Sequence, residues 1–321
     1  MFVLERKKGN SLLTLESIMR RLRSDDTTYQ RFQDMYYKLK KGYEGEQRVD
    51  KEWREIELPY DYCLLHNYET VNEFGHSHQM DTLLITQKFI FVVEIKSITG
   101  RIDMDPTSHQ FKHTKPDNTV EIYLNPLDQV KRHVRFLQRQ LSRWSLYLPI
   151  EYAILASSTN TVIGDMPKNI PFLQLSGLNS FVSMLEQKHP KERISSCELE
   201  QLRIRFLSNL KRNSWIPKMD RSKLIKGAIC EQCKTSMNYY YGRFICESCG
   251  LKSKDSVLQG LHDYRLLFSP WIKNSEFRNY FGLSSSVTSY KLLHSLDLRT
   301  EGINRGRIYY IPENILEHKI R

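Results

Sequence analysis

A short stretch near residue 90 joins an apolar strand to two charged side chains. Residues Phe89–Lys96 read FIFVVEIK, and because side chains alternate along a strand, Glu94 and Lys96 project from the same face. Burying this pair is costly unless something compensates for it. An ammonium group beside a carboxylate that binds a divalent cation is suited to orienting a water molecule or stabilising the charge that develops on a phosphate.

A second β-rich run lies just upstream and is expected to pair with the first. Only a Gln-Lys dipeptide separates Met80–Thr86 from Phe89, which favours an antiparallel hairpin. If Thr86 pairs with Phe89, paired residue numbers add up to 175, so Asp81 lies opposite Glu94. Facing carboxylates repel each other, and Mg²⁺ suits such a pair. Gln-Lys is not a favoured two-residue turn, however, and a three-residue loop would break this pairing.

The composition of the chain limits the classes of protein that it can belong to. With 321 residues, 40% hydrophobic and 26% charged, it is long enough for two or three globular domains. The net charge of +11 and the pI of about 9.2 favour a nucleic acid as partner. We expect a cytoplasmic protein with no membrane segment, no signal peptide and no small-molecule cofactor. The sequence leaves open whether it acts as a homodimer.

The order of predicted elements indicates an α/β domain with a mixed sheet flanked by helices. Residues 1–40 are interpreted as a polar helical segment, and a further helix is expected from 42 to about 55. Strands are predicted at 62–67, 80–86, 89–97, 120–124 and 152–157. Asn125 and Pro126 predict the start of a helix that runs to about Trp144. The predicted domains are 1–40 (helical), 41–177 (α/β), 178–227 (helical extension and linker), 228–258 (zinc ribbon) and 259–321 (winged-helix-like).

Two CxxC motifs form the most specific pattern in the chain. Twelve residues separate the first motif from the second, a spacing typical of a zinc ribbon in which four thiolates close a tetrahedral Zn²⁺ site. Such a site leaves no open coordination position, so its zinc is expected to be structural. The four ligands are Cys230, Cys233, Cys246 and Cys249. Cys63 and Cys197 are interpreted as small buried side chains.

Two further regions are candidates for binding nucleic acid. Residues 274–312 are interpreted as a winged helix, with Arg305 and Arg307 at the tip of its wing; a small protein-interaction domain of the same shape is the alternative. A basic stripe with spacings of three and four follows Asn125, and it either lies along phosphates or forms a solvated helix face. The stripe consists of Arg132, Arg135, Arg139 and Arg143. His76 and His78 are interpreted as loop residues and not as ligands.

Several short motifs, taken in order, resemble one known family. These are GYEGE at 42–46, QMDTLLIT at 79–86, FVVEIKSITG at 91–100 and NPLDQ at 125–129. They resemble the nuclease-related domain (NERD) family, a branch of the PD-(D/E)xK restriction-endonuclease-like superfamily. The resemblance covers about residues 40–160, and the C-terminal part is similar to Bacillus-type members. It implies a restriction-endonuclease-like sheet and a metal-dependent nuclease.

The resemblance also implies roles for individual residues. Asp81 and Glu94 would hold the catalytic Mg²⁺ or Mn²⁺, and Lys96 would be the catalytic lysine. Glu46 would be a further acid, and Gln129 an accessory polar group. This sequence departs from the family in carrying Gln79-Met80 where many relatives have Glu-Ile, and in having no Pro before Asp81. The first departure argues against two-metal chemistry.

Two functional hypotheses follow. The first is a metal-dependent nuclease that hydrolyses phosphodiester bonds, with DNA preferred over RNA as its substrate, and that is targeted by its zinc ribbon and winged helix. The second is a nucleic-acid-binding or regulatory protein that uses a nuclease-derived scaffold without catalysis. In a third, weaker interpretation the zinc ribbon docks onto another protein.

Overall fold

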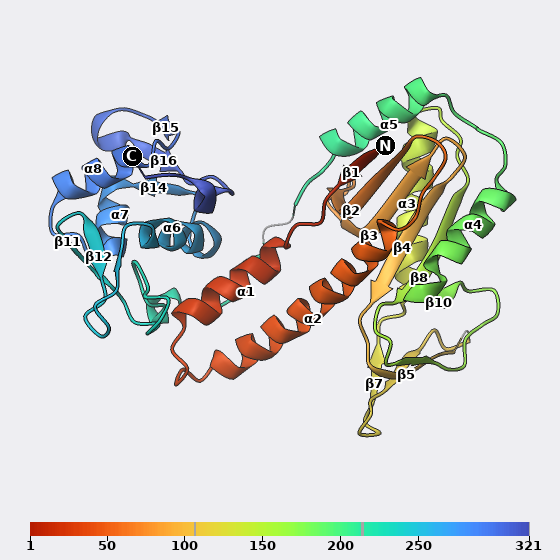
Figure 1. Cartoon of the computed structure of the whole chain (residues 1–321), viewed down its shortest axis with the longest axis horizontal. Coiled ribbons are helices and arrows are strands. Elements are labelled where there is room, and N and C mark those ends of the chain that lie inside the picture. The colour runs from red at the N-terminus through yellow and green to blue at the C-terminus, as the bar shows by residue number, and fades with distance from the viewer. Residues whose placement is uncertain (106, 213–214, 321) are drawn as a thin grey trace. The chain divides into compact units, whose positions relative to one another are not determined.

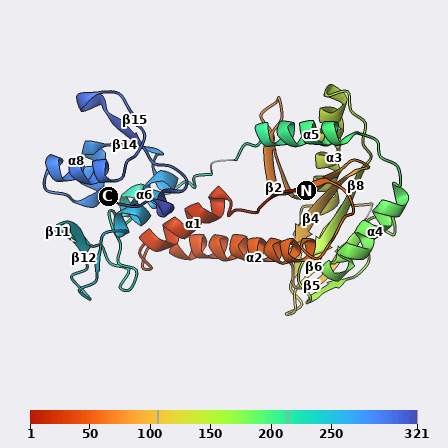
Figure 2. The ribbon, with the colours of Figure 1, turned by 45° about the horizontal axis from the view of Figure 1, so that its top comes forward.

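The computed structural model describes residues 1–105, 107–212 and 215–320, with only the main chain of Arg305. The chain divides into two compact units, each discontinuous in sequence. Unit 1 comprises Met1–Lys8 and Leu39–Asn213, and unit 2 comprises Gly9–Lys38 and Ser214–Arg321. Helix α2 (Tyr29–Trp53) contributes residues to both units, and it is one uninterrupted helix in both ribbon views (Figures 1 and 2).

Unit 1 is built on a mixed six-stranded sheet. The strand order is β1-β2-β3-β4-β8-β10. The first pair and the last two pairs are parallel, and β2, β3 and β4 form an antiparallel meander. The bounds are β1 (Phe2–Leu4), β2 (Tyr62–Val71), β3 (Ser77–Thr86), β4 (Ile90–Lys96), β8 (Ile150–Ala156) and β10 (Phe172–Gln174).

Helices cover both faces of this sheet, because its central strands are apolar on both sides. Helices α3 (Pro126–Arg143) and α5 (Ser196–Ser208) pack on one face. Helix α2 and helix α4 (Leu178–Lys188) pack on the other. As the sequence predicts, the Asn125 side chain caps α3 by accepting a hydrogen bond from the Leu127 N–H at 2.9 Å. The predicted mixed α/β architecture is therefore present.

A second sheet extends unit 1 beyond the predicted elements. Its order is β7-β6-β5-β9, and it packs against Leu127 and Val130 of α3. The sequence analysis anticipated one of these strands. The bounds are β5 (Gly100–Met104), β6 (Phe111–Thr114), β7 (Val120–Tyr123) and β9 (Thr161–Ile163).

Unit 2 combines α1 (Asn10–Arg21) and the first part of α2 with the C-terminal third of the chain. Its residues from 228 onward form two small antiparallel sheets, β11-β12-β13 and β14-β16-β15, around a shared core. The strands of this part are β11 (Asn238–Tyr240), β12 (Arg243–Ile245), β13 (Lys252–Ser253), β14 (Trp271–Lys273), β15 (Thr300–Glu301) and β16 (Ile308–Tyr310). The helices are α6 (Ser256–Leu267), α7 (Asn274–Phe281) and α8 (Ser286–Ser295).

Some sequence predictions need correction. The segment 1–40 is not entirely helical, since β1 joins the sheet of unit 1. The helix predicted from residue 42 is the second half of α2, which begins at Tyr29. His78 is not a loop residue but a buried residue of β3. Cys63 is buried as expected, whereas Cys197 is exposed. Within the described residues, no helix has the length and apolar character needed to span a membrane.

Candidate functional site

The hairpin of β3 and β4 has the register that the sequence predicts. Thr82 pairs with Val93 and Ile85 with Ile90, so paired numbers add up to 175. The Thr86 hydroxyl stabilises the unusual Gln-Lys turn by accepting hydrogen bonds from the N–H groups of Lys88 and Phe89, at 3.1 and 3.0 Å. This local side-chain bonding replaces the favoured turn residues.

The paired residues end at Thr82 and Val93, and Asp81 and Glu94 are the next residues of their strands. Asp81 Oδ2 accepts a hydrogen bond from the Ile95 N–H at 2.7 Å, so the carboxylate is fastened directly to the neighbouring strand. Both carboxylates are buried. Alternation from the Thr82–Val93 pair also assigns Asp81, Glu94 and Lys96 to the same side of the hairpin.

Lys96 lies within hydrogen-bonding distance of two predicted site residues. Its Nζ donates to Glu94 Oε1 at 2.7 Å and to Gln129 Oε1 of α3 at 3.4 Å. Glu94 is 2% exposed, and its second oxygen, Oε2, is buried with no hydrogen-bond partner among the described residues. An unpaired buried carboxylate oxygen is expensive, which makes this atom a natural ligand for a cation.

The electrostatics of the site are dominated by burial and mutual repulsion of acids. Burial, and then the charge of Asp81, raise the pKa of both Glu46 and Glu94 to about 8. Burial also raises the pKa of Asp81 itself. For Lys96, burial lowers the pKa, but the nearby carboxylates outweigh it and the net shift is upward. The ammonium group therefore stays charged, while the acids would gain from a further positive charge.

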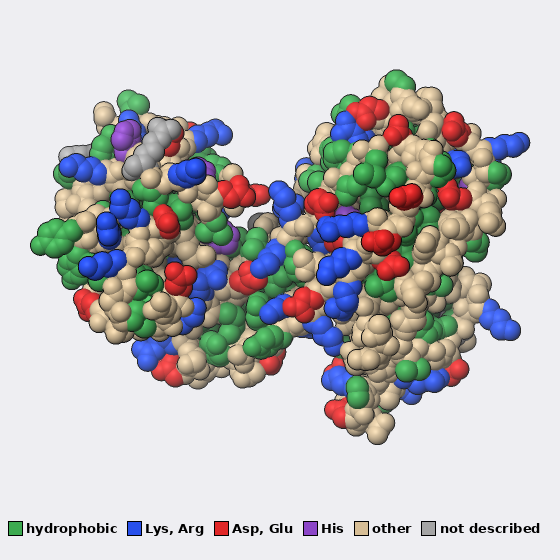
Figure 3. Space-filling view, viewed as in Figure 1, with side chains coloured by type: hydrophobic (Ala, Val, Ile, Leu, Met, Phe, Trp, Pro, Cys, Tyr) green, Lys and Arg blue, Asp and Glu red, His purple; other side chains and the backbone are tan. Residues whose placement is uncertain are grey.

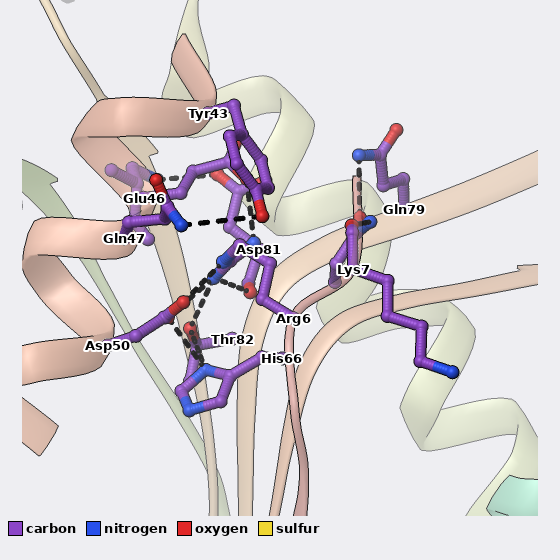
Figure 4. A network of polar contacts seen from close by, with 12 residues as sticks. Arg6, Lys7, Tyr43, Glu46, Gln47, Asp50, His66, Gln79, Asp81 and Thr82 are labelled. Atoms are coloured by element: carbon purple, nitrogen blue, oxygen red, sulfur yellow. Dashed lines mark hydrogen bonds and ion pairs between the residues drawn. The ribbon is translucent and has the colours of Figure 1, made fainter. Parts of the chain in front are cut away.

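Arg6 lies at the centre of the neighbouring polar network. Its guanidinium donates to Glu46 Oε2 at 2.7 Å and to both oxygens of Asp50 at 2.7 and 2.9 Å. It also donates to the main-chain oxygen of Asp81 at 2.7 Å. Figure 4 shows Glu46 and Asp50 of α2 and Asp81 of β3 arranged around this guanidinium. The Arg6 side chain is 1% exposed, so its charge is buried within the site.

Beyond Arg6, the network continues to a buried histidine. His66 Nδ1 lies 3.0 Å from Asp50 Oδ1 and 3.2 Å from the Thr82 hydroxyl, as Figure 4 shows. Burial lowers the pKa of His66 to about 4, so the ring is neutral at pH 7. Asp50 therefore accepts hydrogen bonds from the Arg6 guanidinium and lies beside a neutral imidazole.

The close approach of α2 to the sheet depends on Gly45. A Cβ atom built on Gly45 would lie 2.5 Å from Ser157 Oγ and 2.6 Å from Ser97 Cβ, which is closer than real Cβ contacts. Arg48, one turn along, donates to the Ser157 carbonyl at 2.9 Å. Glycine in a helix interior is unfavourable by about 1 kcal/mol relative to alanine. Here it allows the helix to bring the adjacent Glu46 to the strand ends.

The acids do not by themselves form a closed metal cage. Within the described ranges, the four cysteines are the one group of three or more His, Cys, Asp or Glu side chains whose ligand atoms all lie within 4.8 Å of one another. Glu46 is held by Arg6, and Glu94 by Lys96. Because Mg²⁺ keeps several waters and needs only one or two carboxylates, Asp81 and Glu94 with the unpaired Glu94 Oε2 still fit this ion.

The predicted basic stripe lies on the exposed side of α3. All four arginines are exposed, and a hollow of about 490 Å³ is lined by Arg135, Arg139 and Arg143 with two polar neighbours. Arg143 is also paired with Glu73 at 2.7 Å. On the face seen in Figure 3, Lys and Arg side chains are interspersed with Asp and Glu over both units. Arg307 of the predicted wing is half-buried, and the side chain of Arg305 lies outside the described residues.

The four cysteines of unit 2 form a compact cluster. Cys230 Sγ and Cys249 Sγ are 3.6 Å apart, close to the roughly 3.8 Å expected between tetrahedral ligands with Zn–S bonds of about 2.3 Å. The Thr235 hydroxyl, followed by the Cys249 N–H, lowers the pKa of Cys246 to about 6, whereas the hydrogen bond with Cys249 raises the pKa of Cys233 to about 12. A bound metal ion would favour the thiolate form of all four. The residue after each CxxC motif, Lys234 or Gly250, has a positive φ of 58° or 73°.

The α/β region also matches a known protein family. Residues 41–157 match the family model of NERD, the nuclease-related domain. The chain carries a NERD domain. The matched segment includes every predicted residue of the acidic site, together with the basic stripe. Comparisons with curated proteins and with solved structures give no match.

Arg6, Asp50 and His66 are site residues that the sequence analysis missed. Arg6 lies outside the matched NERD segment, and it reaches the site because β1 pairs in parallel with β2. Asp50 lies one turn after Glu46 on α2, so helical spacing was a signal that it shares this face. His66 lies within an apolar strand with no motif around it, and nothing in its local sequence marks it.

Proposed function

We propose that the protein is a metal-dependent nuclease that hydrolyses phosphodiester bonds, most suitably those of DNA. The observation that carries this proposal is Glu94 Oε2, a buried carboxylate oxygen without a hydrogen-bond partner among the described residues, beside Asp81 and Lys96. A structural ion pair would gain by satisfying that oxygen or by replacing it with an apolar group. The NERD match supports a nuclease-related role for the same residues.

In this proposal Asp81 and Glu94 hold a divalent cation, and Lys96 acts on the attacking water. A bound Mg²⁺ or Mn²⁺ would polarise a phosphoryl oxygen and lower the pKa of a coordinated water. Lys96 Nζ, held between Glu94 and Gln129, orients the nucleophile or offsets charge in the transition state. Glu46 supports the site from α2, and Arg6 fixes the position of Glu46.

The charges around the site favour one catalytic cation over two. The site contains four carboxylates and two cationic side chains, so the formal charge is −4 + 2 = −2 when all are ionised, and one divalent ion balances it. The Arg6 guanidinium already offsets one of the two negative charges on the α2 side of the cluster. The acids are Glu46, Asp50, Asp81 and Glu94, and the cations are Arg6 and Lys96.

Other parts of the chain would hold and target the substrate. The exposed arginines of α3 suit phosphate contacts, and the elements after the zinc ribbon follow one another in the order α6-β14-α7-α8-β15-β16, which is compatible with the predicted winged helix. In that arrangement α8 would read the nucleic acid, and Arg305 and Arg307 would contact its backbone. The zinc ribbon would complete the targeting part.

The test is a cleavage assay on the purified full chain. We expect cleavage with Mg²⁺ or Mn²⁺, and its loss in Lys96→Ala with binding retained. Lys168→Ala, which removes one charge from unit 1 at a position outside the acidic site, is the matched control. Parallel single-stranded, duplex, branched and RNA substrates define the preference. Cleavage that survives Lys96→Ala would reject the assignment.

A second candidate function, binding without catalysis, is favoured by one specific observation. Both cationic side chains of the site already have carboxylate partners: Lys96 pairs with Glu94, and Arg6 pairs with Glu46 and Asp50. Such pairing is also expected of an ion-pair cluster that only stabilises the fold. Manganese binding separates the two candidates independently of activity. Titration of Mn²⁺ followed by electron paramagnetic resonance should reveal a site in the wild type that Asp81→Asn removes, and absence of that site supports a pure binder.

A further inference from the structure

The zinc ribbon presents one face of its three-stranded sheet to solvent. Tyr239 and Phe244 point to the other face, where Phe244 is buried and packs against Phe281. Because side chains alternate along a strand, Tyr240 and its cross-strand partner Arg243 lie together on the solvent side, and both are exposed.

The same face continues onto the third strand. Ile245, two residues after Arg243, pairs with Lys252 of β13, and Lys252 is exposed. At the far end of the face Asn238 donates to the Glu247 carboxylate at 2.6 Å, so this acid is bonded to a neighbour away from the Tyr240–Arg243 pair. One aromatic ring and two cations therefore occupy a small sheet surface.

A second tyrosine projects from the tip of the hairpin. Tyr241 is fully exposed, at 101% of its reference area, and its φ is 46°, followed by Gly242 at 82°. A two-residue turn with two positive φ angles favours Asn, Asp or Gly at its first position, and a bulky residue there is strained. Tyr241 gains no burial in return. The backbone thus bears a strain that the fold itself does not require.

The position of this tip is fixed by the cysteine cluster. The β11–β12 hairpin lies between Cys233 and Cys246, and both of these belong to the four-thiolate group. A metal that closes this group clamps the hairpin at both ends. The two tyrosine rings are then preorganised, and little conformational entropy is lost when a ligand stacks on them.

Exposed aromatic rings beside cations match the chemistry of unpaired nucleobases. Bases stack on aromatic side chains with little dependence on sequence, and basic groups contact the backbone phosphates. In a duplex the base faces are stacked on one another and are not accessible to a tyrosine ring. We propose that Tyr240 and Tyr241 of the zinc ribbon form a stacking platform for single-stranded nucleic acid, with Arg243 and Lys252 on its phosphates.

This inference deepens the proposed function, on which its class of partner rests. It specifies that the nucleic acid bound by unit 2 has an unpaired segment, such as a single strand, an overhang or a fork. The ribbon would hold this segment whether or not the NERD domain cleaves it. Binding and cleavage can therefore be measured separately.

The experiment uses the zinc-loaded full chain carrying Lys96→Ala, without added Mg²⁺. Fluorescence anisotropy measures binding of a labelled oligothymidylate and of a duplex of equal length. The double substitution Tyr240→Ala/Tyr241→Ala should weaken single-strand binding about 10-fold or more, because base stacking contributes roughly 1–3 kcal/mol per base. Duplex binding should change little. The double Phe variant, which keeps both rings, should bind the single strand as the parent does.

Two further variants separate stacking from structure. Tyr147→Ala removes a tyrosine of unit 1 that is 75% exposed and should leave both affinities unchanged. Tyr241→Asn relieves the strained turn, so it should leave the melting temperature unchanged or raise it while weakening single-strand binding. A purely structural Tyr241 would instead lose stability.

The outcomes are distinct for the two proposals. Unchanged single-strand affinity in the double Ala variant, or an equal loss for duplex, overturns the stacking platform regardless of cleavage. If the tyrosines are needed for single-strand binding but the wild-type chain never cleaves with Mg²⁺ or Mn²⁺, the platform stands and the nuclease assignment fails.

Discussion

The guanidinium of Arg6 lies 2.7 Å from the carboxylate of Glu46, although forty positions separate the two residues in sequence. The segment that carries Arg6 precedes the NERD match, yet it supplies the cation that fixes an acid of the NERD domain. Strand β1 makes this possible by pairing in parallel with β2. The acidic site therefore depends on chain outside the segment that the family describes.

Removing the Arg6 charge should destabilise unit 1 strongly. Arg6→Gln would leave Asp50 and Glu46 in a buried environment without their cation, and breaking one side of a buried ion pair costs about 3–5 kcal/mol. Arg6→Lys should recover only part of this, because an ammonium group cannot form the two-pronged contact with Asp50. Thermal unfolding followed by circular dichroism measures the loss.

The control for Arg6 is an exposed arginine of the same unit. Arg54, 68% exposed, faces Glu5 at 3.8 Å, so Arg54→Gln should change stability by no more than about 0.5 kcal/mol. Equal melting temperatures for Arg6→Gln and Arg54→Gln would contradict the role given to Arg6.

Two glycines of α2 should respond in opposite directions to alanine. A methyl group on Gly45 would collide with Ser97 and Ser157, so Gly45→Ala should destabilise the protein by about 1–3 kcal/mol and weaken Mn²⁺ binding by displacing Glu46. A methyl group on Gly42 would meet no described atom within 4 Å, so Gly42→Ala should stabilise the helix by about 0.5–1 kcal/mol. Urea unfolding compares them, and the same sign for both would refute the packing argument.

The buried pair of His78 and His133 should make stability depend on pH. Their Nδ1 atoms are 3.2 Å apart, and burial lowers the pKa of His78 to about 4 and of His133 to about 3. Because unfolded histidine titrates near pH 6.5, the unfolded chain binds more protons than the folded one below that pH. The two neutral histidines therefore make their full contribution to stability above about pH 6.5. This contribution is lost as the pH falls toward 4.

His133→Gln should reduce this dependence. Between pH 6.5 and pH 5, one fully buried histidine lowers the free energy of unfolding by about 2 kcal/mol. The His133→Gln variant should not show this part of the decrease. His109→Gln, at a side chain that is 63% exposed, is the control and should retain the wild-type slope. Urea midpoints at pH 7 and pH 5 give the comparison, and an unchanged slope in His133→Gln would exclude the histidine pair as its source.

Zinc should be required for the fold of the ribbon. We expect elemental analysis to find a single zinc ion bound to the four cysteines, and Cys230→Ser to lose it together with a large part of the stability of unit 2, since binding of structural zinc is coupled to folding. Cys197→Ser changes an exposed cysteine outside the cluster and should retain both zinc and stability. A metal-free wild-type protein with the same melting behaviour would overturn this expectation.

The hairpin and its aligned carboxylates were predictable from the sequence because their causes are local. Two apolar runs, a short connection and the alternation of side chains determine which residues face each other. The capped start of α3 was predictable for the same reason, since Asn125 and Pro126 act on adjacent residues. The four-cysteine cluster follows from spacing alone.

The missed features depend on contacts between distant segments. β1 is three residues long, and its parallel partner lies about sixty positions away, so no local pattern marks it as a strand. Arg6 follows in a charged segment that resembles a solvent-exposed tail. The Ser between His76 and His78, just before the predicted strand, favours a loop, whereas the ring of His78 is stacked on Phe136 of α3. In all three, the strand β1, Arg6 and His78, contacts with distant segments determine the structure.

The register of the β3–β4 hairpin restricts how the sequence of this part of the chain can change during evolution. Asp81 faces Glu94 only because paired numbers have a constant sum. Inserting or deleting one residue within either strand would turn its acid toward the opposite face of the sheet, whereas apolar substitutions along the strands leave the alignment intact. We therefore expect related sequences to tolerate many replacements within the two strands, and to change in length at the turn but not within a single strand.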